Sequence, residues 1–517
     1  MQLRPEGTVN TKLVTGKIEV LAARAGHYSH SESLPFEVTK STETNEELRM
    51  KYRYLDLRNP AVQKNLFVRH QVYQSIRCAL DAEKFIEVET PILTKSTPEG
   101  ARDYLVPSRM NPGEFYALPQ SPQLFKQILM VSGFDRYFQI AKCFRDEDLR
   151  ADRQPEFTQL DMEMSFVKEE DIFSVVEKVA KNIFKDVLGK DLPTPFQRLT
   201  YQEAMATYGT DKPDLRFEVK IQDMTLLAKQ STMDLFRNAD TILAMCLPWG
   251  NPSRKDIDDL DTFVKAEGAG GLPYLKVTPP AAASQDIPRE HLQLTSPIAK
   301  FFSESLQKQI IKDLNAHDGD LIVCAIGDRK KSQKILGSLR LHVSKLKGLA
   351  KSDTFHFSWI TDFPLFQRNE EEKRWDSEHH PFTSPHMEDW NKHKASGELE
   401  KIRSSAYDLV LNGNEIASGS IRIHDRALQR EIFKTIGLDE KEAESRFGFL
   451  LKAFEFGPPP HGGIALGIDR VITILLGLTS IREVIAFPKN QKAADPMTDA
   501  PSGVAEKQLK ELGIRIR

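Results

Sequence analysis

The sequence predicts an α+β fold in which a largely antiparallel sheet is flanked by helices and interrupted by an inserted module. Strand-like segments joined by turns occur on both sides of residues 214–351, which is typical of antiparallel hairpins. The stretch between them has a different texture, with a Gly/Pro-rich loop at 267–273. This change of texture indicates a self-contained insertion that splits a larger module.

Length and charge narrow the function classes. At about 150 residues per domain, a chain of 517 residues holds roughly three to four domains. Lys and Arg number 71 against 74 Asp and Glu, giving a net charge of −3. This balance argues against coating nucleic acid by bulk charge, but it is compatible with a local basic groove. No apolar run reaches the roughly 18 residues that a membrane span needs.

The four cysteines carry no metal-binding or redox pattern. They lie far apart without a CxxC pair and within apolar runs, so we predict reduced residues of the core. These residues are Cys78, Cys143, Cys246 and Cys324.

The elements before the insertion follow from local patterns. Residues 11–22 alternate well enough for a strand or a short hairpin. The polar stretch 38–50 indicates a hinge or linker. Apolar residues at helical spacing predict a helix over 63–83, and a short strand should follow over 85–89 and end at Pro91.

Within and after the insertion the same rules apply. Residues 298–314 have a helical pattern, and 320–327 form an apolar run typical of a buried strand. Strand-rich texture returns over 355–366 and again over 407–424.

The first candidate site is a predicted hairpin over residues 137–164, whose two strands flank a highly charged loop. On the first strand Arg145 and Glu147 share a face with three residues before them, and on the second strand polar residues alternate with apolar ones. A shared polar face would form a platform for a nucleotide and an amino acid. A solvated hairpin with surface ion pairs is the alternative. The second strand's polar face is Phe157, Gln159, Asp161 and Glu163, and its apolar face is Leu160, Met162 and Met164.

The second candidate site is a hairpin around the turn Asn412–Gly413. Asp408 and Glu415 could approach across this turn, and two carboxylates near a triphosphate are a usual Mg²⁺ site. Arg422 lies seven residues after Glu415, on the opposite face under strict alternation. We predict that a bulge at Gly419 brings them together; an ordinary hairpin is the alternative.

The third candidate is a Gly-rich strand that runs into a helix over residues 461–477. Asp469 is predicted as the N-cap and Gly477 as the end of the helix. Arg470 would then lie at the helix start, where anions are favoured. His461 is predicted as a packing or turn residue. Neither GxxxxGK[ST] nor GxGxxG occurs, so bound ATP would be held by arginines.

Together these segments resemble the three motifs of the class II aminoacyl-tRNA synthetases. The motif-like segments are 85–91, 144–147 with its loop and second strand, and 463–470. More narrowly, the chain is similar to the bacterial-type aspartyl-tRNA synthetases over nearly its whole length. Segments 97–109, 120–127, 150–157 and 379–383 and the Asn-Gly-Asn-Glu turn carry this similarity.

The resemblance implies a class II synthetase sheet and a domain order. Only the closing part of the family's N-terminal OB-fold anticodon-binding barrel is matched, so the chain is expected to be N-terminally short. The implied domains are an OB-fold remnant (1–40), a hinge (41–55), the first part of the catalytic domain (56–213), a GAD-like α+β insertion (214–351) and the second catalytic part (352–517).

The implied reaction is activation of L-aspartate by ATP, followed by transfer to tRNA-Asp and, as an open option, tRNA-Asn. The resemblance also implies Mg²⁺, a homodimer built on the first motif, and no membrane. It implies a cytoplasmic location, with a mitochondrial or plastid matrix as the alternative.

The resemblance assigns roles residue by residue. Arg145, Glu147 and Arg470 are expected to be catalytic, with Arg145 bridging the α-carboxylate and α-phosphate, and Arg150 and Arg153 are expected to meet acceptor-stem phosphates. The aspartate set is Glu99, Ser121, Gln123, Lys126, Arg145, Asp161, His379, His380 and Arg422. The ATP set is Arg145, Glu147, Gln154, Phe157, Glu415, Gly467, Ile468, Asp469 and Arg470, and Asp408 and Glu415 are expected to hold Mg²⁺.

Two rival functions remain open at this level. One is an asparaginyl-tRNA synthetase-like ligase, but Lys126 with Arg422 favours a charged amino-acid side chain, since an unpaired buried charge costs about 3–5 kcal/mol. The other is a non-catalytic RNA-binding paralogue, which should have lost a motif arginine or carboxylate; this chain keeps them.

Overall fold

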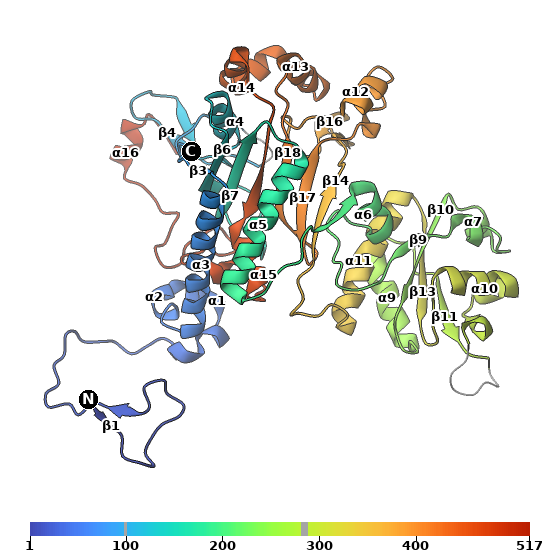
Figure 1. Cartoon of the computed structure of the whole chain (residues 1–517), viewed down its shortest axis with the longest axis horizontal. Helices are drawn as coiled ribbons and strands as arrows, with labels where there is room; N and C mark the ends of the chain where they lie inside the picture. Colours follow the sequence, from blue (N-terminus) through green and yellow to red (C-terminus); the bar gives the residue numbers. More distant parts are fainter. Residues whose placement is uncertain (98–100, 281–287, 517) are drawn as a thin grey trace.

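The computed structural model describes residues 1–97, 101–280 and 288–516. Its centre is an eight-stranded sheet (Figure 1) that pairs antiparallel except at its two edges, where β3 runs parallel to β6 and β8 parallel to β14. In spatial order the strands are β3 (Ile86–Glu87), β6 (Arg136–Phe144), β7 (Glu156–Ser165), β19 (His461–Gly467), β18 (Asn414–Ile421), β17 (Ala406–Leu411), β14 (Phe357–Thr361) and β8 (Gln197–Thr200).

One face of this sheet carries the main hydrophobic core. The helices α3 (Pro60–Ala82), α5 (Glu169–Leu188) and α15 (Ile468–Leu475) pack there and share one buried apolar cluster with the strands. Leu160, Met162 and Met164 of β7 belong to that cluster. The predicted apolar face of β7 is therefore confirmed, and its other face is left for polar residues.

A smaller group of helices stands at one end of the sheet. Its core joins Leu124 of α4 with Phe433 of α13 and Phe447 of α14. The bounds are α4 Gln123–Val131, α13 Arg426–Thr435 and α14 Glu440–Ala453, with α12 (Met387–His393), β15 (Phe366–Asn369), β16 (Arg374–Ser377), β4 (Leu105–Pro107) and β5 (Phe115–Ala117) nearby.

Residues 214–351 contain a second, five-stranded sheet with apolar clusters of its own, which stands beside the large sheet in Figure 1. Its strands, in spatial order, are β12 (Gln293–Thr295), β11 (Tyr274–Thr278), β13 (Leu321–Gly327), β10 (Thr241–Leu247) and β9 (Ile221–Asp223). The helices here are α7 (Thr225–Ala228), α8 (Asp234–Arg237), α9 (Arg254–Ala266), α10 (Glu304–Asp313) and α11 (Arg329–Lys347), and α6 (Tyr201–Tyr208) precedes them. The predicted strand at 320–327 is confirmed, and the helix predicted over 298–314 is confirmed for 304–313, after a 3₁₀ turn at 299–301.

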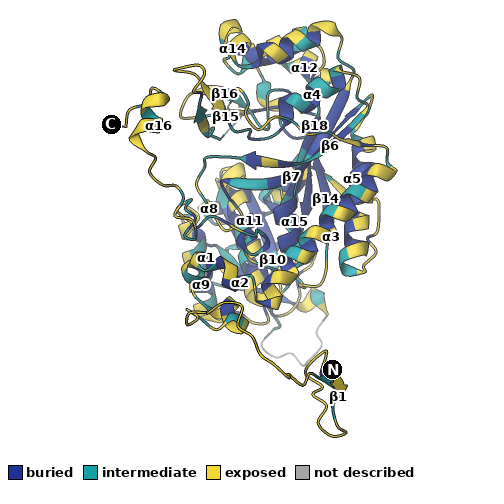
Figure 2. Ribbon diagram, turned by 90° about the vertical axis from the view of Figure 1, so that its left-hand side faces the viewer, coloured by how far each residue is buried: buried dark blue, intermediate teal, exposed yellow. Residues whose placement is uncertain are grey.

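The first residues pack little. β1 (Gln2–Leu3) and β2 (Ile18–Glu19) pair antiparallel, and most residues up to 40 are exposed (Figure 2). The predicted hinge differs from the structure: a 3₁₀ turn (Val38–Glu43), α1 (Glu46–Lys51) and α2 (Arg53–Asp56) are regular elements. The C-terminal end carries α16 (Glu506–Glu511).

Two further expectations meet the structure here. Cys143 and Cys324 are buried and Cys246 is half-buried, but Cys78 is exposed, so the core prediction is wrong for Cys78. Cys78 lies two residues from both Ile76 and Leu80, which places it on the face of α3 opposite the buried residues. Among the described residues, no helix is both long and apolar enough to cross a bilayer.

Candidate active site

A cavity of about 780 Å³ opens on the sheet face opposite α3, α5 and α15. It is lined by the end of β6 and its loop, by β7, β18 and β19, and by the start of α15. The predicted site residues line this cavity with three exceptions. Glu99 lies outside the described residues, Ile468 is fully buried, and Asp408 is buried below the surface of the cavity.

The β6–β7 hairpin supplies the floor. Its register pairs Gln139 with Asp161 and Cys143 with Phe157. Phe157, Gln159 and Asp161 line the cavity, as strict alternation along β7 predicts. Gln159 was not in the predicted site set, although the same alternation points to it.

Arg145 and Arg470 both line the cavity beside this floor, Arg145 from the loop after β6 and Arg470 from the start of α15. The Arg145 guanidinium lies over the ring of Phe157, 5.0 Å from its centroid. Arg470 donates to the carbonyl oxygen of Glu415, and its second amino nitrogen lies 3.4 Å from a carboxylate oxygen of Asp152. Two residues that the resemblance assigns as catalytic therefore line the same cavity.

Behind the floor, two cations and two carboxylates are buried together. Lys126 Nζ lies 2.9 Å from Asp161 Oδ1 and 3.5 Å from Glu163 Oε2. Arg422 donates to both carboxylate oxygens of Glu163, at 2.9 and 3.2 Å. Glu163 therefore already neutralises part of the charge of Lys126 and Arg422. The sequence-based prediction treated these two cations as unpaired until aspartate binds and did not include Glu163.

Glu163 keeps its charge in this cluster. Burial works to raise the pKa of Glu163, but the charges of Arg422 and Lys126 outweigh burial and hold the pKa below its ordinary value. Space for the carboxylate comes from Gly463 on the neighbouring strand, where an added Cβ would lie 1.9 Å from Glu163 Oε2. Only a glycine leaves room for this close approach of the carboxylate to the strand.

The two neighbouring histidines have different environments. His380 Nε2 lies 2.6 Å from Arg422; burial and the charge of Arg422 hold the pKa of His380 well below its ordinary value, so it is neutral. His379 Nε2 lies 3.4 Å from Asp408 Oδ1. Burial works to lower the pKa of His379, but the interaction with Asp408 outweighs burial and raises it. His379 therefore shields one buried carboxylate.

Asp408 and Glu415 come together across the predicted Asn412–Gly413 turn, in which both residues have positive φ. The bulge predicted at Gly419 is wrong. Leu409 pairs with Ala417 but Val410 pairs with Glu415, so Ile416 is the extra residue. This shift places Glu415 on the face of Arg422. Burial raises the pKa of Glu415, and the nearby charge of Asp408 raises it further.

The N-cap prediction for Asp469 is also wrong. α15 begins at Ile468 after Gly467, which is in the N-cap position. Asp469 Oδ2 instead accepts from the backbone N–H of Thr158 at 2.9 Å, and Oδ1 pairs with Arg69 of α3. Asp469 therefore ties β7 to two helices. The predicted helix end is confirmed, since Gly477 follows with a left-handed φ.

Several polar atoms aimed at the cavity are buried without a hydrogen-bond partner in the described part of the chain. Asp161 Oδ2 and Gln123 Nε2 lie on the side of Lys126; Asp408 Oδ1 accepts no hydrogen bond from the described residues either, but it lies below the cavity surface, 3.4 Å from His379 Nε2. Buried polar atoms of this kind are normally satisfied. A ligand with an ammonium group and carbonyl-type oxygens would satisfy the first two atoms.

The remaining predicted residues hold the loop between β6 and β7. Glu147 accepts from Arg153 at 2.9 Å, and the Gln154 side chain exchanges two hydrogen bonds with the backbone of Lys489.

Lys212, just before the insertion, lines the cavity 4.0 Å from Glu415 Oε2. No sequence pattern marks Lys212. His461 is fully buried, with Nδ1 2.8 Å from the carbonyl oxygen of Pro459, so its predicted packing role is confirmed.

Comparison with known proteins agrees with this geometry. Residues 45–491 match the family described as tRNA synthetases class II (D, K and N). The chain is 51% identical to the Aspartate--tRNA(Asp/Asn) ligase of Aquifex aeolicus (strain VF5), over 99% of this chain and 85% of that protein. It is also 51% identical to the Aspartate--tRNA ligase of Clostridium tetani (strain Massachusetts / E88), over 98% of this chain and 85% of that protein. The chain therefore belongs to the class II tRNA synthetases and, within them, to the aspartate–tRNA ligase family.

Proposed function

We propose that this protein activates L-aspartate with ATP to aspartyl-adenylate and then transfers the aspartyl group to the terminal adenosine of tRNA-Asp. One observation carries the proposal: Lys126, Arg145, Arg422 and Arg470, which are scattered along the sequence, line one cavity. The names of the relatives support aspartate as the amino acid. Some of those names include tRNA-Asn, so tRNA-Asn is a second acceptor to be tested.

The charges around Lys126 fit a dianionic amino acid. Asp161, with its unpartnered Oδ2, would accept from the α-ammonium group, and Ser121 and Gln123 would orient it. Asp161 also lies 2.9 Å from Lys126 Nζ, but its charge would be matched by the α-ammonium group, so Lys126 and Arg422 with Glu163 would leave one positive charge for the side-chain carboxylate of aspartate. Glu99, His379 and His380 complete the proposed aspartate set. Asparagine lacks the charge that this site needs.

The other half of the cavity fits a nucleotide. Adenine would stack between Phe157 and Arg470, with Glu147, Gln154 and the backbone of Gly467 and Ile468 beside it, and Asp469 would hold this wall in place. Since Arg145 lies over Phe157 in the structure, adenine binding requires Arg145 to leave the ring. A negative α-phosphate favours that movement, because Arg binds phosphate and carboxylate oxygens with a rigid planar fork.

Chemistry then depends on bringing negative groups together. An oxygen of the α-carboxylate attacks the α-phosphorus of ATP, an oxygen–phosphorus bond forms, and the bond to the β-phosphate oxygen breaks to release pyrophosphate. No side chain has to take up a proton in this step. Arg145 and Arg470 would offset the charge on the phosphates, so catalysis is mainly positioning and electrostatic stabilisation.

Asp408 and Glu415 would hold Mg²⁺ against the triphosphate. The fit rests on the buried Asp408 beside the partly exposed Glu415, on Asp408 Oδ1, which accepts no hydrogen bond from the described residues, and on the raised pKa of Glu415; carboxylates are ligands that Mg²⁺ prefers. Among the described residues no group of three or more His, Cys, Asp or Glu is placed to hold a metal ion. The other ligands would therefore come from phosphate and water, and the ion would neutralise charge on the triphosphate.

A homodimer is proposed on the edge of the large sheet. β3 is an edge strand, and Ile86, Ile92 and Leu93 are about half exposed there. The nearby β4–β5 hairpin, joined through the Thr94–Ala117 bridge, exposes Leu105, Phe115 and Tyr116. An apolar surface of this kind on a self-complementary edge suits a two-fold interface.

Further assignments follow from the resemblance and remain proposals. Residues 214–351, which have their own sheet, would be the GAD-like domain, 1–40 the OB-fold remnant and 41–55 the hinge, between catalytic parts 56–213 and 352–517. Arg150 and Arg153 on the loop would meet acceptor-stem phosphates of tRNA. The proposed location is the cytoplasm, with a mitochondrial or plastid matrix as the alternative.

Aspartate-dependent exchange of labelled pyrophosphate into ATP tests the proposal directly. We expect exchange with aspartate, little with asparagine, and none without Mg²⁺. Charging of purified tRNA-Asp and tRNA-Asn, measured separately, defines the acceptor. A folded protein that shows no exchange with any amino acid but still binds tRNA would favour the RNA-binding alternative.

A further inference from the structure

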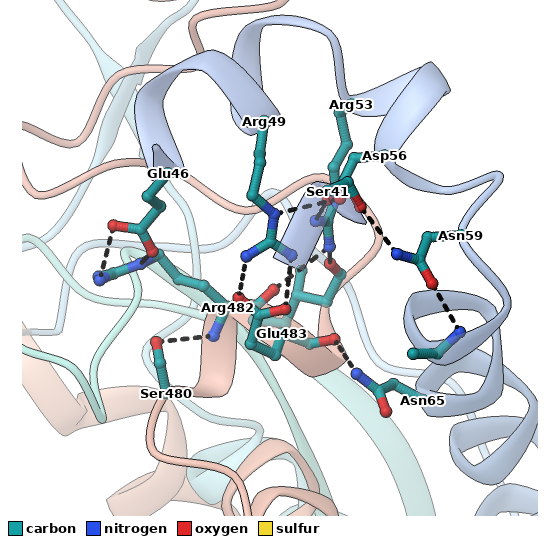
Figure 3. A network of polar contacts seen from close by, with 12 residues as sticks. Ser41, Glu46, Arg49, Arg53, Asp56, Asn59, Asn65, Ser480, Arg482 and Glu483 are labelled. Atoms are coloured by element: carbon teal, nitrogen blue, oxygen red, sulfur yellow. Dashed lines mark hydrogen bonds and ion pairs between the residues drawn. The ribbon is translucent and has the colours of Figure 1, made fainter. Parts of the chain in front are cut away.

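Residues 480–490, the bridge segment, lie between the N-terminal helices α1 and α2 on one side and the β6–β7 loop of the active site on the other. The segment begins just after α15 and contains the 3₁₀ turn Ile481–Val484. Figure 3 shows its contacts with the N-terminal helices at close range. None of the roles proposed above uses this segment.

Ion pairs fix the bridge segment to the N-terminal helices. Arg482 donates to both carboxylate oxygens of Glu46, at 2.7 and 3.2 Å. Arg49 donates to both carboxylate oxygens of Glu483, each at 2.9 Å, and also to Asp56. Arg53 donates to the carbonyl oxygens of the two residues after this turn, Ile485 and Ala486, at 3.0 and 2.9 Å.

The Arg49 and Arg482 side chains are each only 8% exposed. The ion pairs of these two arginines are bidentate, and the guanidinium groups are largely shielded from water. Their geometry is therefore better defined than that of ordinary surface ion pairs. Arg482 Nη1 finds no hydrogen-bond partner in the described residues, so the Arg482 guanidinium is held by Glu46 alone among carboxylates. The Arg482 side chain therefore depends on Glu46 of α1, while Arg49 and Arg53 hold the rest of the turn.

The other side of the bridge segment contacts the β6–β7 loop of the active site. The backbone N–H of Ile481 donates to the carbonyl oxygen of Ala151 at 3.1 Å. Lys489 exchanges backbone hydrogen bonds with the Gln154 amide, at 2.7 and 3.0 Å, and its Nζ lies 3.1 Å from Glu156. Ile481 and Gln154 line the cavity themselves.

We propose that Arg482 and Glu483 are positioning residues for the nucleotide half of the active site, and that α1, through Glu46 and Arg49, sets where the β6–β7 loop stands. The expected effect on the KM for ATP rests on the proposed function, whereas the expected effect on the position of the β6–β7 loop does not. Since coupling is reciprocal, a movement of α1 would be felt at the loop, and nucleotide binding at the loop would be felt at α1.

Glu46→Gln is the test variant because Glu46 is half-exposed and the change keeps its shape. Asp389→Asn is a matched control: Arg403 donates to Asp389 at the same 2.7 and 3.2 Å, away from the loop. In pyrophosphate exchange we expect Glu46→Gln to raise the KM for ATP about 3- to 10-fold, with the KM for aspartate nearly unchanged. Asp389→Asn should leave both values as in the wild type.

Hydrogen–deuterium exchange supplies a readout that needs no activity. Amides of residues 147–156 should exchange at least about 3-fold faster in Glu46→Gln than in Asp389→Asn, because the loop opens locally more often. The inference is overturned if loop exchange and both KM values match the control. If the wild type lacks aspartate-dependent exchange while the loop responds to Glu46→Gln, the proposed function fails and the positioning role stands.

Discussion

Arg422 holds Glu163 with two hydrogen bonds, at 2.9 and 3.2 Å, deep behind the aspartate half of the cavity. The carboxylate also lies 3.5 Å from Lys126 Nζ. Both partners of the Arg422–Glu163 pair are almost completely buried. A buried pair contributes little net stability when intact, but removing one partner leaves a charge that neither water nor protein satisfies.

We predict that Glu163→Gln lowers the free energy of unfolding by about 3–5 kcal/mol. The neutral amide cannot offset the charges of Lys126 and Arg422, and the aspartate site would carry one positive charge too many. Urea unfolding measures the effect. Glu170→Gln is the control, because the Arg198–Glu170 pair is exposed and its loss should cost at most about 1 kcal/mol. Equal losses in the two variants would contradict the argument.

Gly463→Ala should damage the same cluster from the neighbouring strand. Its Cβ would lie 1.9 Å from Glu163 Oε2 and 2.1 Å from the carbonyl oxygen of Met162. Because one contact is backbone, the strand must shift, at a cost of about 1–3 kcal/mol or more. Gly467→Ala, whose nearest contact is 3.7 Å, should cost under about 1 kcal/mol. Thermal unfolding compares the two variants; equal midpoints would show that the space at Gly463 is not needed.

Much of the site could be predicted from alternation and turn chemistry. The polar face of β7 and the Asn412–Gly413 turn follow directly from residue spacing. Local patterns could not locate the bulge at Ile416. The position of a bulge is set by packing between neighbouring strands, and the glycine that favoured a bulge in the sequence lies three residues later. The first strand's pattern likewise extends to Arg145, but the strand itself ends at Phe144.

Partners that meet only in the fold were beyond sequence reasoning. Asp is a residue type that favours the N-cap position, but the carboxylate of Asp469 instead pairs with Arg69 and accepts a hydrogen bond from the backbone N–H of Thr158. Glu46 and Arg482 lie at opposite ends of the chain. No periodicity within either segment indicates that these two charges pair.

Amino-acid selectivity follows from the charges around Lys126. With Glu163 offsetting one of two cations, the site keeps one positive charge for the substrate side chain. We predict that kcat/KM for pyrophosphate exchange is about 10²–10³ higher with aspartate than with asparagine. Lys126→Gln should remove most of this ratio, mainly by lowering the value for aspartate. An unchanged ratio in that variant would show that Lys126 does not read the side chain.

Metal dependence tests the pair of carboxylates. Burial and the charge of Asp408 raise the pKa of Glu415, and a divalent cation would relieve this repulsion. We predict that Asp408→Asn raises the Mg²⁺ concentration for half-maximal exchange by about 10-fold, as expected when a ligand to a weakly held metal is lost. The KM for aspartate is the internal control, and a Mg²⁺ profile identical to the wild type would place the ion elsewhere.

Glu169, at the start of α5, makes stability depend on pH. The pKa of Glu169 is raised from its ordinary 4.5 to about 7, chiefly by burial; a hydrogen bond with Ser405 opposes this rise, and the charges of Asp362 and Glu170 contribute to it. Below pH 4.5 the carboxyl is protonated in both the folded and the unfolded chain. Between pH 4.5 and 7 the unfolded chain ionises this group while the folded chain keeps it protonated, so the free energy of unfolding falls by up to about 3 kcal/mol over this range and changes little above pH 7.

Glu169→Gln should remove this loss, because the amide keeps a similar shape and never ionises. In urea unfolding, we expect the variant to match the wild type near pH 5 and to be more stable by about 1–3 kcal/mol at pH 8. Glu170→Gln, on the exposed neighbour, removes a negative charge from the same turn; because the Glu170 charge helps to raise the pKa of Glu169, this variant should lose less stability between pH 5 and 8 than the wild type but more than Glu169→Gln. A stability difference between Glu169→Gln and the wild type that is the same at both pH values would mean that Glu169 is ionised throughout. Burial would then not govern its pKa.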